Sequence, residues 1–222
     1  MTAWYGSVRV LVRTVVFGAL GGMRTRGGEH VPREGRLIVA PVHLSYMDPP
    51  AVACGLPRQL TFMAKEELFR GAFGWVIRSL GAFPVKRGDA DTEAIKQALA
   101  LLEEERALLV FPEGTRGDGV TLLPINRGVT LLARRSGAPV LPVAICGTHK
   151  ILPKGGKGVR RSKIEIVCGP TFRYADFASE KDPKEAFSRH LRDELLRLQT
   201  EAGLPLRSGS GRPEPAESGS HE

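Results

Sequence analysis

Short apolar runs alternate with amphipathic segments over most of the chain. The runs are bounded by glycine, proline or polar residues, as buried strands are, and they occur at residues 37–42, 60–64, 83–85, 107–111, 140–145 and 164–168. The amphipathic segments repeat apolar residues at helical spacing, at residues 48–54, 66–80, 91–102, 127–136 and 182–198. This alternation predicts an α/β fold in which helices flank a mixed, largely parallel sheet.

The composition along the 222 residues divides the chain into three regions. We predict an N-terminal membrane-associating helical segment at residues 1–28, one globular domain at residues 29–206, and a tail at residues 207–222. The tail is rich in Ser, Gly, Pro and Glu and has too few apolar residues for a core, so we expect it to be disordered.

The segment from Trp4 to Leu20 is apolar except for Arg9 and Arg13. Its uninterrupted apolar run is far shorter than the roughly 20 residues that cross a bilayer. As a helix, the segment would separate the two arginines from a face made of Val8, Leu11, Val12 and Val15. We expect an amphipathic helix in the membrane interface, with Trp4 beside the headgroups and Tyr5 next to it, or a helix packed on the core with two surface arginines.

The formal net charge of +8 predicts attraction to polyanions, which include nucleic acid, an anionic membrane surface and phosphorylated small molecules. Nucleic acid fits least, because the basic residues form no long run and aromatic residues make up only 6% of the chain. Cys54, Cys146 and Cys168 lack the spacing of a disulfide framework or a metal site, which predicts buried free thiols in a reducing compartment.

Polar residues follow several predicted strands. His43 comes after the first strand, Arg87 after the strand at residues 83–85, and residues 113–116 after the strand at 107–111. In open α/β sheets, ligands bind beyond the carboxyl ends of the strands. These residues are therefore expected to form one site at one edge of the sheet.

His43 and Asp48 suit general-base chemistry. A hydroxyl group is a poor nucleophile until a base takes its proton, and a histidine does this well near neutral pH. A carboxylate bonded to the second ring nitrogen would fix the tautomer of His43, and Asp48 can serve if the turn folds back. Two alternatives remain: His43 is an ordinary loop histidine, and Asp48 caps a helix that begins with Pro49.

The stretch Phe-Pro-Glu-Gly-Thr-Arg at residues 111–116 suits anion binding. Gly114 permits close backbone approach, and Arg116 offers a planar fork of donors for phosphate oxygens. Glu113 could hold a substrate hydroxyl or brace Arg116. Arg127 stands at a predicted helix start, where amide groups also favour anions. The alternative is a plain turn with a solvated Glu–Arg pair.

Four ordered blocks resemble those of the glycerolipid acyltransferases, which are typified by 1-acylglycerol-3-phosphate acyltransferase. The blocks N-H-x4-D, G-x-[IF]-x-V-x-R and F-P-E-G-[TS]-R-S correspond to residues 42–48, 81–87 and 111–117. The fourth, a Val-Pro strand, corresponds to residues 140–143. The resemblance covers roughly residues 30–170, with Val42 in place of the usual Asn and Gly117 in place of Ser.

This resemblance implies an acyltransferase domain that moves a fatty acyl group from acyl-CoA or acyl-carrier protein to the free hydroxyl of lysophosphatidic acid, giving phosphatidic acid. His43 would be the base and Asp48 its orienting partner, without a covalent intermediate, metal or further cofactor. Substrate binding is expected from Arg87, Glu113, Gly114, Thr115, Arg116 and Arg127. The enzyme would work at the cytoplasmic face of the cell membrane as a peripheral or monotopic protein, docked by its N-terminal helix on the anionic membrane surface.

Other functions stay open. The acceptor could instead be glycerol 3-phosphate, another lysophospholipid or a glycolipid. A metal-dependent phosphohydrolase could use His43, Asp48 and Glu113 as ligands. A thioesterase could use Cys146 and His149, and a non-catalytic membrane- or nucleic-acid-binding protein would explain the charge but not the polar residues at the strand ends.

Overall fold

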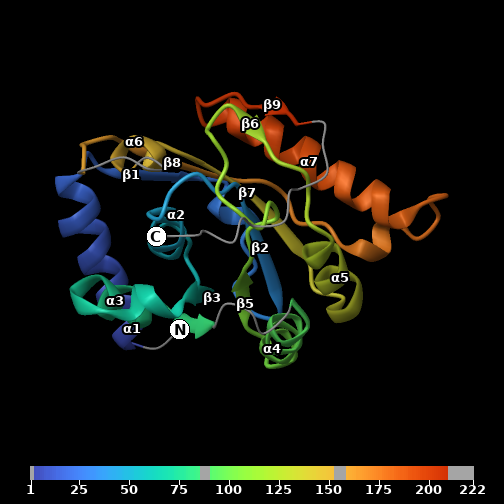
Figure 1. Ribbon diagram of the computed structural model, residues 1–222, viewed down its shortest axis with the longest axis horizontal. Coiled ribbons are helices and arrows are strands. Elements are labelled where there is room, and N and C mark those ends of the chain that lie inside the picture. The colour runs from blue at the N-terminus through green and yellow to red at the C-terminus, as the bar shows by residue number, and fades with distance from the viewer. Residues whose placement is uncertain (1–2, 86–90, 153–158, 210–222) are drawn as a thin grey trace, which may run out of the picture.

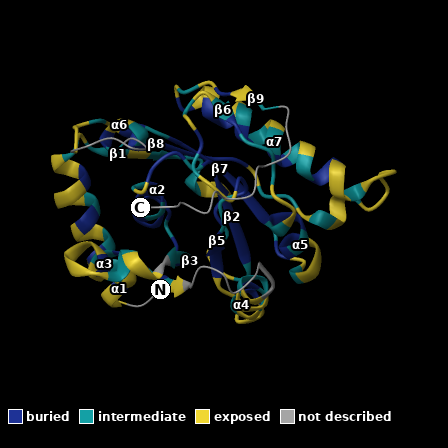
Figure 2. Ribbon diagram, in the orientation of Figure 1, coloured by how far each residue is buried: buried dark blue, intermediate teal, exposed yellow. Residues whose placement is uncertain are grey.

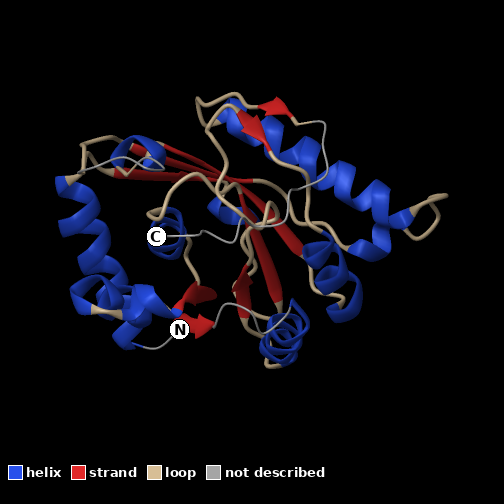
Figure 3. Cartoon of the chain, in the orientation of Figure 1, coloured by secondary structure: helices blue, strands red, loops and turns tan. Residues whose placement is uncertain are grey.

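The computed structural model describes residues 3–85, 91–152 and 159–209, whose backbone is shown in Figure 1. Their main sheet has the strand order β1-β8-β7-β2-β5-β3-β4. The strands are β1 (Met23–Arg26), β2 (Leu37–Pro41), β3 (Leu60–Lys65), β4 (Ala82–Val85), β5 (Ala107–Leu109), β7 (Val140–Cys146) and β8 (Ile164–Cys168). All neighbouring strands are parallel except β7 and β8. The predicted mixed, largely parallel sheet is confirmed (Figure 3).

Helices cover both faces of this sheet (Figure 1). One face packs against α1 (Ala3–Leu11), the π-helical η1 (Val12–Phe17), α2 (Asp48–Gly55) and α3 (Gly71–Ser79). The other packs against α4 (Asp91–Glu103), α5 (Arg127–Ser136) and α7 (Pro183–Glu201). The shorter elements are η2 (Gly28–His30), η3 (Glu66–Phe69), β6 (Thr121–Leu122), α6 (Thr148–Ile151), η4 (Tyr174–Phe177) and β9 (Arg207–Ser208).

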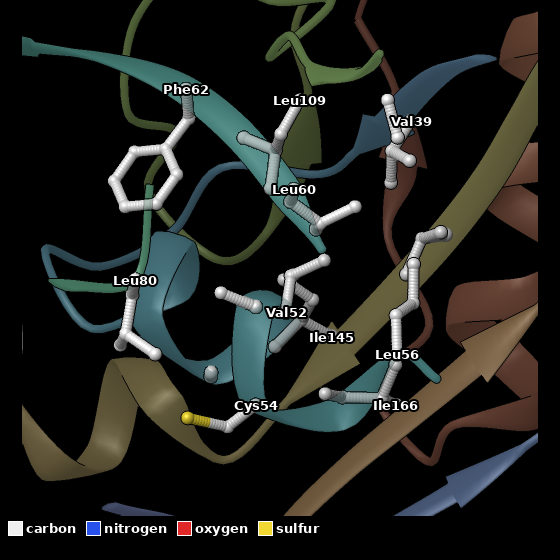
Figure 4. Close-up of a cluster of buried hydrophobic side chains, with 14 of the residues drawn as sticks. Val39, Val52, Cys54, Leu56, Leu60, Phe62, Leu80, Leu109, Ile145 and Ile166 are labelled. Atoms are coloured by element: carbon white, nitrogen blue, oxygen red, sulfur yellow. The ribbon is translucent and has the colours of Figure 1, made fainter. Parts of the chain in front are cut away.

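The strands read as continuous apolar runs because both of their faces are buried. Successive side chains of a strand point to opposite sides, so Leu37 and Val39 of β2 enter one core cluster while Ile38 enters the other. Figure 4 shows part of the first cluster, where Val52 of α2 lies among strand residues such as Leu60. Figure 2 shows the same division, with buried strands inside and exposed helix surfaces outside.

The N-terminal helix packs on the core. Tyr5 is buried, and its hydroxyl group donates a hydrogen bond to the carbonyl of Ala53 at 3.1 Å. Arg9 and Arg13 donate hydrogen bonds to the carbonyl oxygens of Leu56 and Cys54, at the C-terminal end of α2. Carbonyls at a helix end lack intrahelical donors and carry partial negative charge, so cations bind there favourably. The expected position of Tyr5 near lipid headgroups is therefore wrong, and the arginines hold α1 and η1 against α2.

Three local features differ from the sequence analysis. The predicted helix at residues 66–80 is broken at Arg70, whose extended backbone (φ −97°, ψ 147°) separates η3 from α3. The predicted N-terminal segment contains β1, which pairs with β8 and so belongs to the sheet. The predicted tail begins at residue 207, yet β9 pairs with β6. These short strands lack a periodicity of their own and form because a partner strand is present. Residues 210–222 lie outside the described residues.

Candidate active site

The candidate residues meet where neighbouring parallel strands end. β7, β2 and β5 lie side by side and point in the same direction. His43 follows β2 and residues 111–116 follow β5, so both loops leave the sheet at the same edge. The backbone amide of Gly117 donates a hydrogen bond to the carbonyl oxygen of His43 at 2.8 Å, which shows that the two loops are in contact.

His43 and Asp48 form a hydrogen-bonded pair. The Nδ1 atom of His43 lies 3.0 Å from the Oδ2 atom of Asp48, with the imidazole 17% exposed and the carboxylate fully buried. The same oxygen accepts hydrogen bonds from the backbone amides of Leu44 at 2.6 Å and Ser45 at 2.7 Å. Because a carboxylate only accepts hydrogen bonds, Nδ1 carries the proton and Nε2 keeps its lone pair for a substrate.

The capping alternative for Asp48 is wrong in its geometry. Helix α2 begins at Asp48 itself, Met47 occupies the N-cap position, and no side chain caps the helix. The carboxylate turns back to the preceding loop, where it accepts two amide hydrogen bonds besides that of His43. This arrangement fits the role of a group that orients the imidazole.

The buried carboxylate of Glu113 links the loop of residues 111–116 to the loop that carries His43. It is only 2% exposed, and its two carboxylate oxygens accept hydrogen bonds from the amides of His43 at 2.9 Å and Leu123 at 3.0 Å. Burial raises the pKa of Glu113 from 4.5 to about 7, although the two amide hydrogen bonds act in the opposite direction. We expected Glu113 to hold a substrate hydroxyl or to brace Arg116. Its oxygens instead fix the backbone of the histidine loop.

Two stacked pairs also connect these loops. The imidazole of His43 lies against the ring of Phe111, with centroids 3.7 Å apart and planes inclined by 18°. The guanidinium carbon of Arg116 lies 3.7 Å from the centroid of the Tyr46 ring. The sequence pattern indicates His43 and Arg116 but not their aromatic partners, because spacing along the chain does not show which rings face each other.

The start of α5 adjoins the loop of residues 111–116. The amide of Asn126 donates a hydrogen bond to the carbonyl of Pro112 at 2.7 Å. A Cβ atom at Gly114, whose φ is +68°, would lie 3.3 Å from the side-chain nitrogen of Asn126. Arg127 is the first residue of α5 and is exposed, as Gly114 and Thr115 are. The predicted cationic residue Arg87 lies outside the described residues.

The geometry does not favour the rival chemistries. A thioesterase needs a thiolate and a protonated histidine, but burial raises the pKa of the Cys146 thiol and lowers the pKa of His149. A metal site would need Glu113, whose oxygens face backbone amides. In the described part of the chain, no three His, Cys, Asp or Glu side chains are grouped as metal ligands.

Comparisons with known proteins identify the family of this chain. The acyltransferase family model matches residues 22–146, from just before β1 to the end of β7. A 1-acyl-sn-glycerol-3-phosphate acyltransferase of Bacillus subtilis is 30% identical over 190 residues, which cover 83% of this chain and 92% of that relative. A lyso-ornithine lipid O-acyltransferase of Pseudomonas aeruginosa is 37% identical over 116 residues, which cover 51% of this chain and 44% of that relative.

A solved structure is also similar. The crystal structure of the 1-acyl-sn-glycerophosphate (LPA) acyltransferase PlsC from Thermotoga maritima has a TM-score of 0.75 and 28% sequence identity, over 89% of this chain and 78% of that one. The family match spans more than half of the chain and contains both interlocked loops. The chain is therefore a member of the acyltransferase family.

Proposed function

We propose that this protein transfers a fatty acyl group from acyl-CoA or acyl-carrier protein to the free hydroxyl of lysophosphatidic acid, giving phosphatidic acid. The observation that carries this proposal is the His43–Asp48 pair in a loop whose Tyr46 ring holds the guanidinium of Arg116. It places a base and a cationic group that can bind phosphate at the same edge of the sheet. The activities named for the relatives from Bacillus subtilis and Thermotoga maritima support the same acceptor.

The reaction needs one proton carrier. The Nε2 atom of His43 takes the proton from the acceptor hydroxyl as its oxygen attacks the thioester carbonyl carbon. The tetrahedral intermediate then expels the thiolate of the donor, which receives the proton from the imidazolium. Asp48 stabilises the imidazolium and holds the ring in its orientation. No covalent bond between enzyme and acyl group forms, and the acyl donor is the cosubstrate.

Arg116 is proposed to bind the acceptor phosphate, together with Arg127 and Arg87. Arg116→Ala should raise the KM for lysophosphatidic acid by about 10-fold or more, because charge-assisted hydrogen bonds to phosphate are lost. Steady-state kinetics with lysophosphatidic acid and with monoacylglycerol will measure this effect, and the phosphate-free acceptor is the control. Unchanged kinetics with lysophosphatidic acid would remove Arg116 from the phosphate site.

The class of acceptor is tested separately. The relative that acylates a lyso-ornithine lipid keeps other acceptors open, among them glycerol 3-phosphate, other lysophospholipids and glycolipids. The experiment is incubation with labelled acyl-CoA or acyl-carrier protein and a panel of these acceptors, followed by lipid analysis. We expect label in phosphatidic acid. Label in another lipid alone would correct the acceptor but keep acyl transfer, and no labelled lipid would contradict both.

We also propose that the protein docks on the cytoplasmic face of the membrane as a peripheral protein. None of the helices in the described residues has both the length and the apolar character of a membrane span. The large exposed apolar side chains of α1, η1 and α3 form what we call the apolar helix patch: Trp4, Val10, Leu11, Val15, Val16, Phe73 and Trp75. The rings of Trp4 and Trp75 meet edge to face, with centroids 6.2 Å apart, and so join α1 to α3.

Leu11→Asp and Trp75→Asp should each weaken binding to phospholipid vesicles by about tenfold or more, because a buried apolar side chain contributes about 1.5–3 kcal/mol. Since the arginines of α1 and η1 face α2, apolar insertion should dominate, and binding should largely survive added salt. Vesicle sedimentation measures both effects, with Trp75→Phe as the matched control. Binding that disappears at high salt but tolerates these substitutions would contradict the proposed patch.

A further inference from the structure

Tyr46 lies in the loop between the two catalytic residues. Tyr46 is 38% exposed, and the centroid of its ring lies 3.7 Å from the guanidinium carbon of Arg116. The loop is held by its own hydrogen bonds: the amide of Asp48 donates to the carbonyl of Ser45 at 3.1 Å, and the hydroxyl of Ser45 donates to the carbonyl of Leu152 at 2.9 Å. The position of the ring is therefore tied to the backbone that carries the base.

The contact restricts Arg116 without occupying the edge of its guanidinium group. Arginine donors lie in the guanidinium plane, whereas an aromatic ring binds the face of that plane. A long arginine side chain has many rotamers, and binding a ligand becomes less costly in entropy as contacts within the protein restrict them. A ring stacked on the guanidinium lowers this cost before the ligand arrives.

We propose that Tyr46 is a positioning residue that orients Arg116 toward the acceptor phosphate and thereby favours anionic acceptors. This inference rests on the proposed function. Tyr46 acts through its ring and Arg116, and its hydroxyl is not needed. Since the same loop carries His43 and Asp48, the stack also sets the phosphate site at a fixed position relative to the base.

The test compares Tyr46→Phe, which keeps the ring, with Tyr46→Leu, which removes it. The Leu variant should raise the KM and the Kd for lysophosphatidic acid by about 3- to 30-fold, with kcat nearly unchanged. The Phe variant should behave like the unmodified protein. The rise in KM should be larger for lysophosphatidic acid than for monoacylglycerol, which has no phosphate, and thermal unfolding will verify that the exposed substitution leaves the fold intact.

A double-substitution cycle tests the route of the effect. In an Arg116→Ala background, Tyr46→Leu should change KM no further. The inference is overturned if the Leu variant keeps the original KM and Kd, if the Phe variant is as impaired as the Leu variant, or if the loss persists without Arg116. Unmodified protein that binds lysophosphatidic acid without acylating it would overturn the proposed function alone, and the Kd values would still decide the role of Tyr46. Absence of both binding and acylation would overturn both.

Discussion

His43→Ala is expected to lower the rate of acyl transfer by about 10²- to 10⁴-fold, which is the usual contribution of a positioned base. The Nδ1 atom is bonded to Asp48, so Nε2 is the atom that can accept the hydroxyl proton. The imidazole is 17% exposed and follows the end of β2 rather than lying within a strand, so the variant should stay folded. Steady-state acyl transfer and the thermal unfolding midpoint measure the two parts of this result.

Two further variants make the result specific. His30→Ala is the matched control, because His30 is exposed and its Nδ1 atom lies 3.0 Å from the carbonyl oxygen of Cys168, away from the site. Asp48→Asn should also lower turnover, since it removes the charge that stabilises the imidazolium. Full turnover in His43→Ala would contradict the base assignment, and the proposed mechanism would then be abandoned.

Glu113→Ala is expected to reduce the free energy of unfolding by about 3 kcal/mol and to reduce acyl transfer. The substitution leaves the amides of His43 and Leu123 without an acceptor, and each unsatisfied buried donor costs about 1–3 kcal/mol. Chemical denaturation and steady-state kinetics measure the two losses. Glu67→Ala, at an exposed carboxylate on η3, is the control and should change neither.

The pH dependence of folding stability distinguishes a titrating Glu113 carboxyl group from a side chain that only fills space. Its folded-state pKa of about 7 lies above 4.5, so the folded protein binds more protons than the unfolded chain between these values. The stabilisation linked to protonation of Glu113 is fully present below pH 4.5 and is lost as pH rises through about 7. It is separate from the two amide hydrogen bonds that Glu113→Ala removes. One pKa unit corresponds to about 1.4 kcal/mol, so the rise in the pKa of Glu113 on folding corresponds to roughly 3 kcal/mol of folding stability.

Glu113→Gln does not titrate and supplies the comparison. The free energy of unfolding of the unmodified protein, relative to this variant, should fall between pH 4.5 and 7 and level off above. Denaturation curves at several pH values measure this difference. A constant difference over that range would show that the folded-state pKa of Glu113 is not raised.

Two loops from adjacent strands of the sheet hold each other at the site. Glu113 binds the amide of His43, Gly117 binds its carbonyl, and Phe111 covers its ring. Behind this loop, α2 is held at its C-terminal end by Arg9 of α1. Reacting groups fixed in this way lose little entropy when a substrate binds, which is where much of the rate enhancement of bimolecular reactions originates.

Local pattern in the sequence determined much of this architecture. The apolar run before His43 became β2, and the segment at residues 127–136 became α5 with Asn126 as its cap. Apolar periodicity reports burial within a few residues, so it identifies strands and helices and the polar residues that follow them. The ordered blocks were sufficient to indicate the family, which the comparison confirmed.

Tertiary structure alone decided which groups touch. The strand order, the backward turn of the Asp48 carboxylate and the two amide hydrogen bonds of Glu113 involve partners that no local pattern reveals. Arg9 was expected at a surface and instead binds the end of α2, because the carbonyls there lacked donors. Contacts between residues far apart in the chain depend on how the layers pack. A sequence pattern describes only the secondary structure and the buried face of each segment.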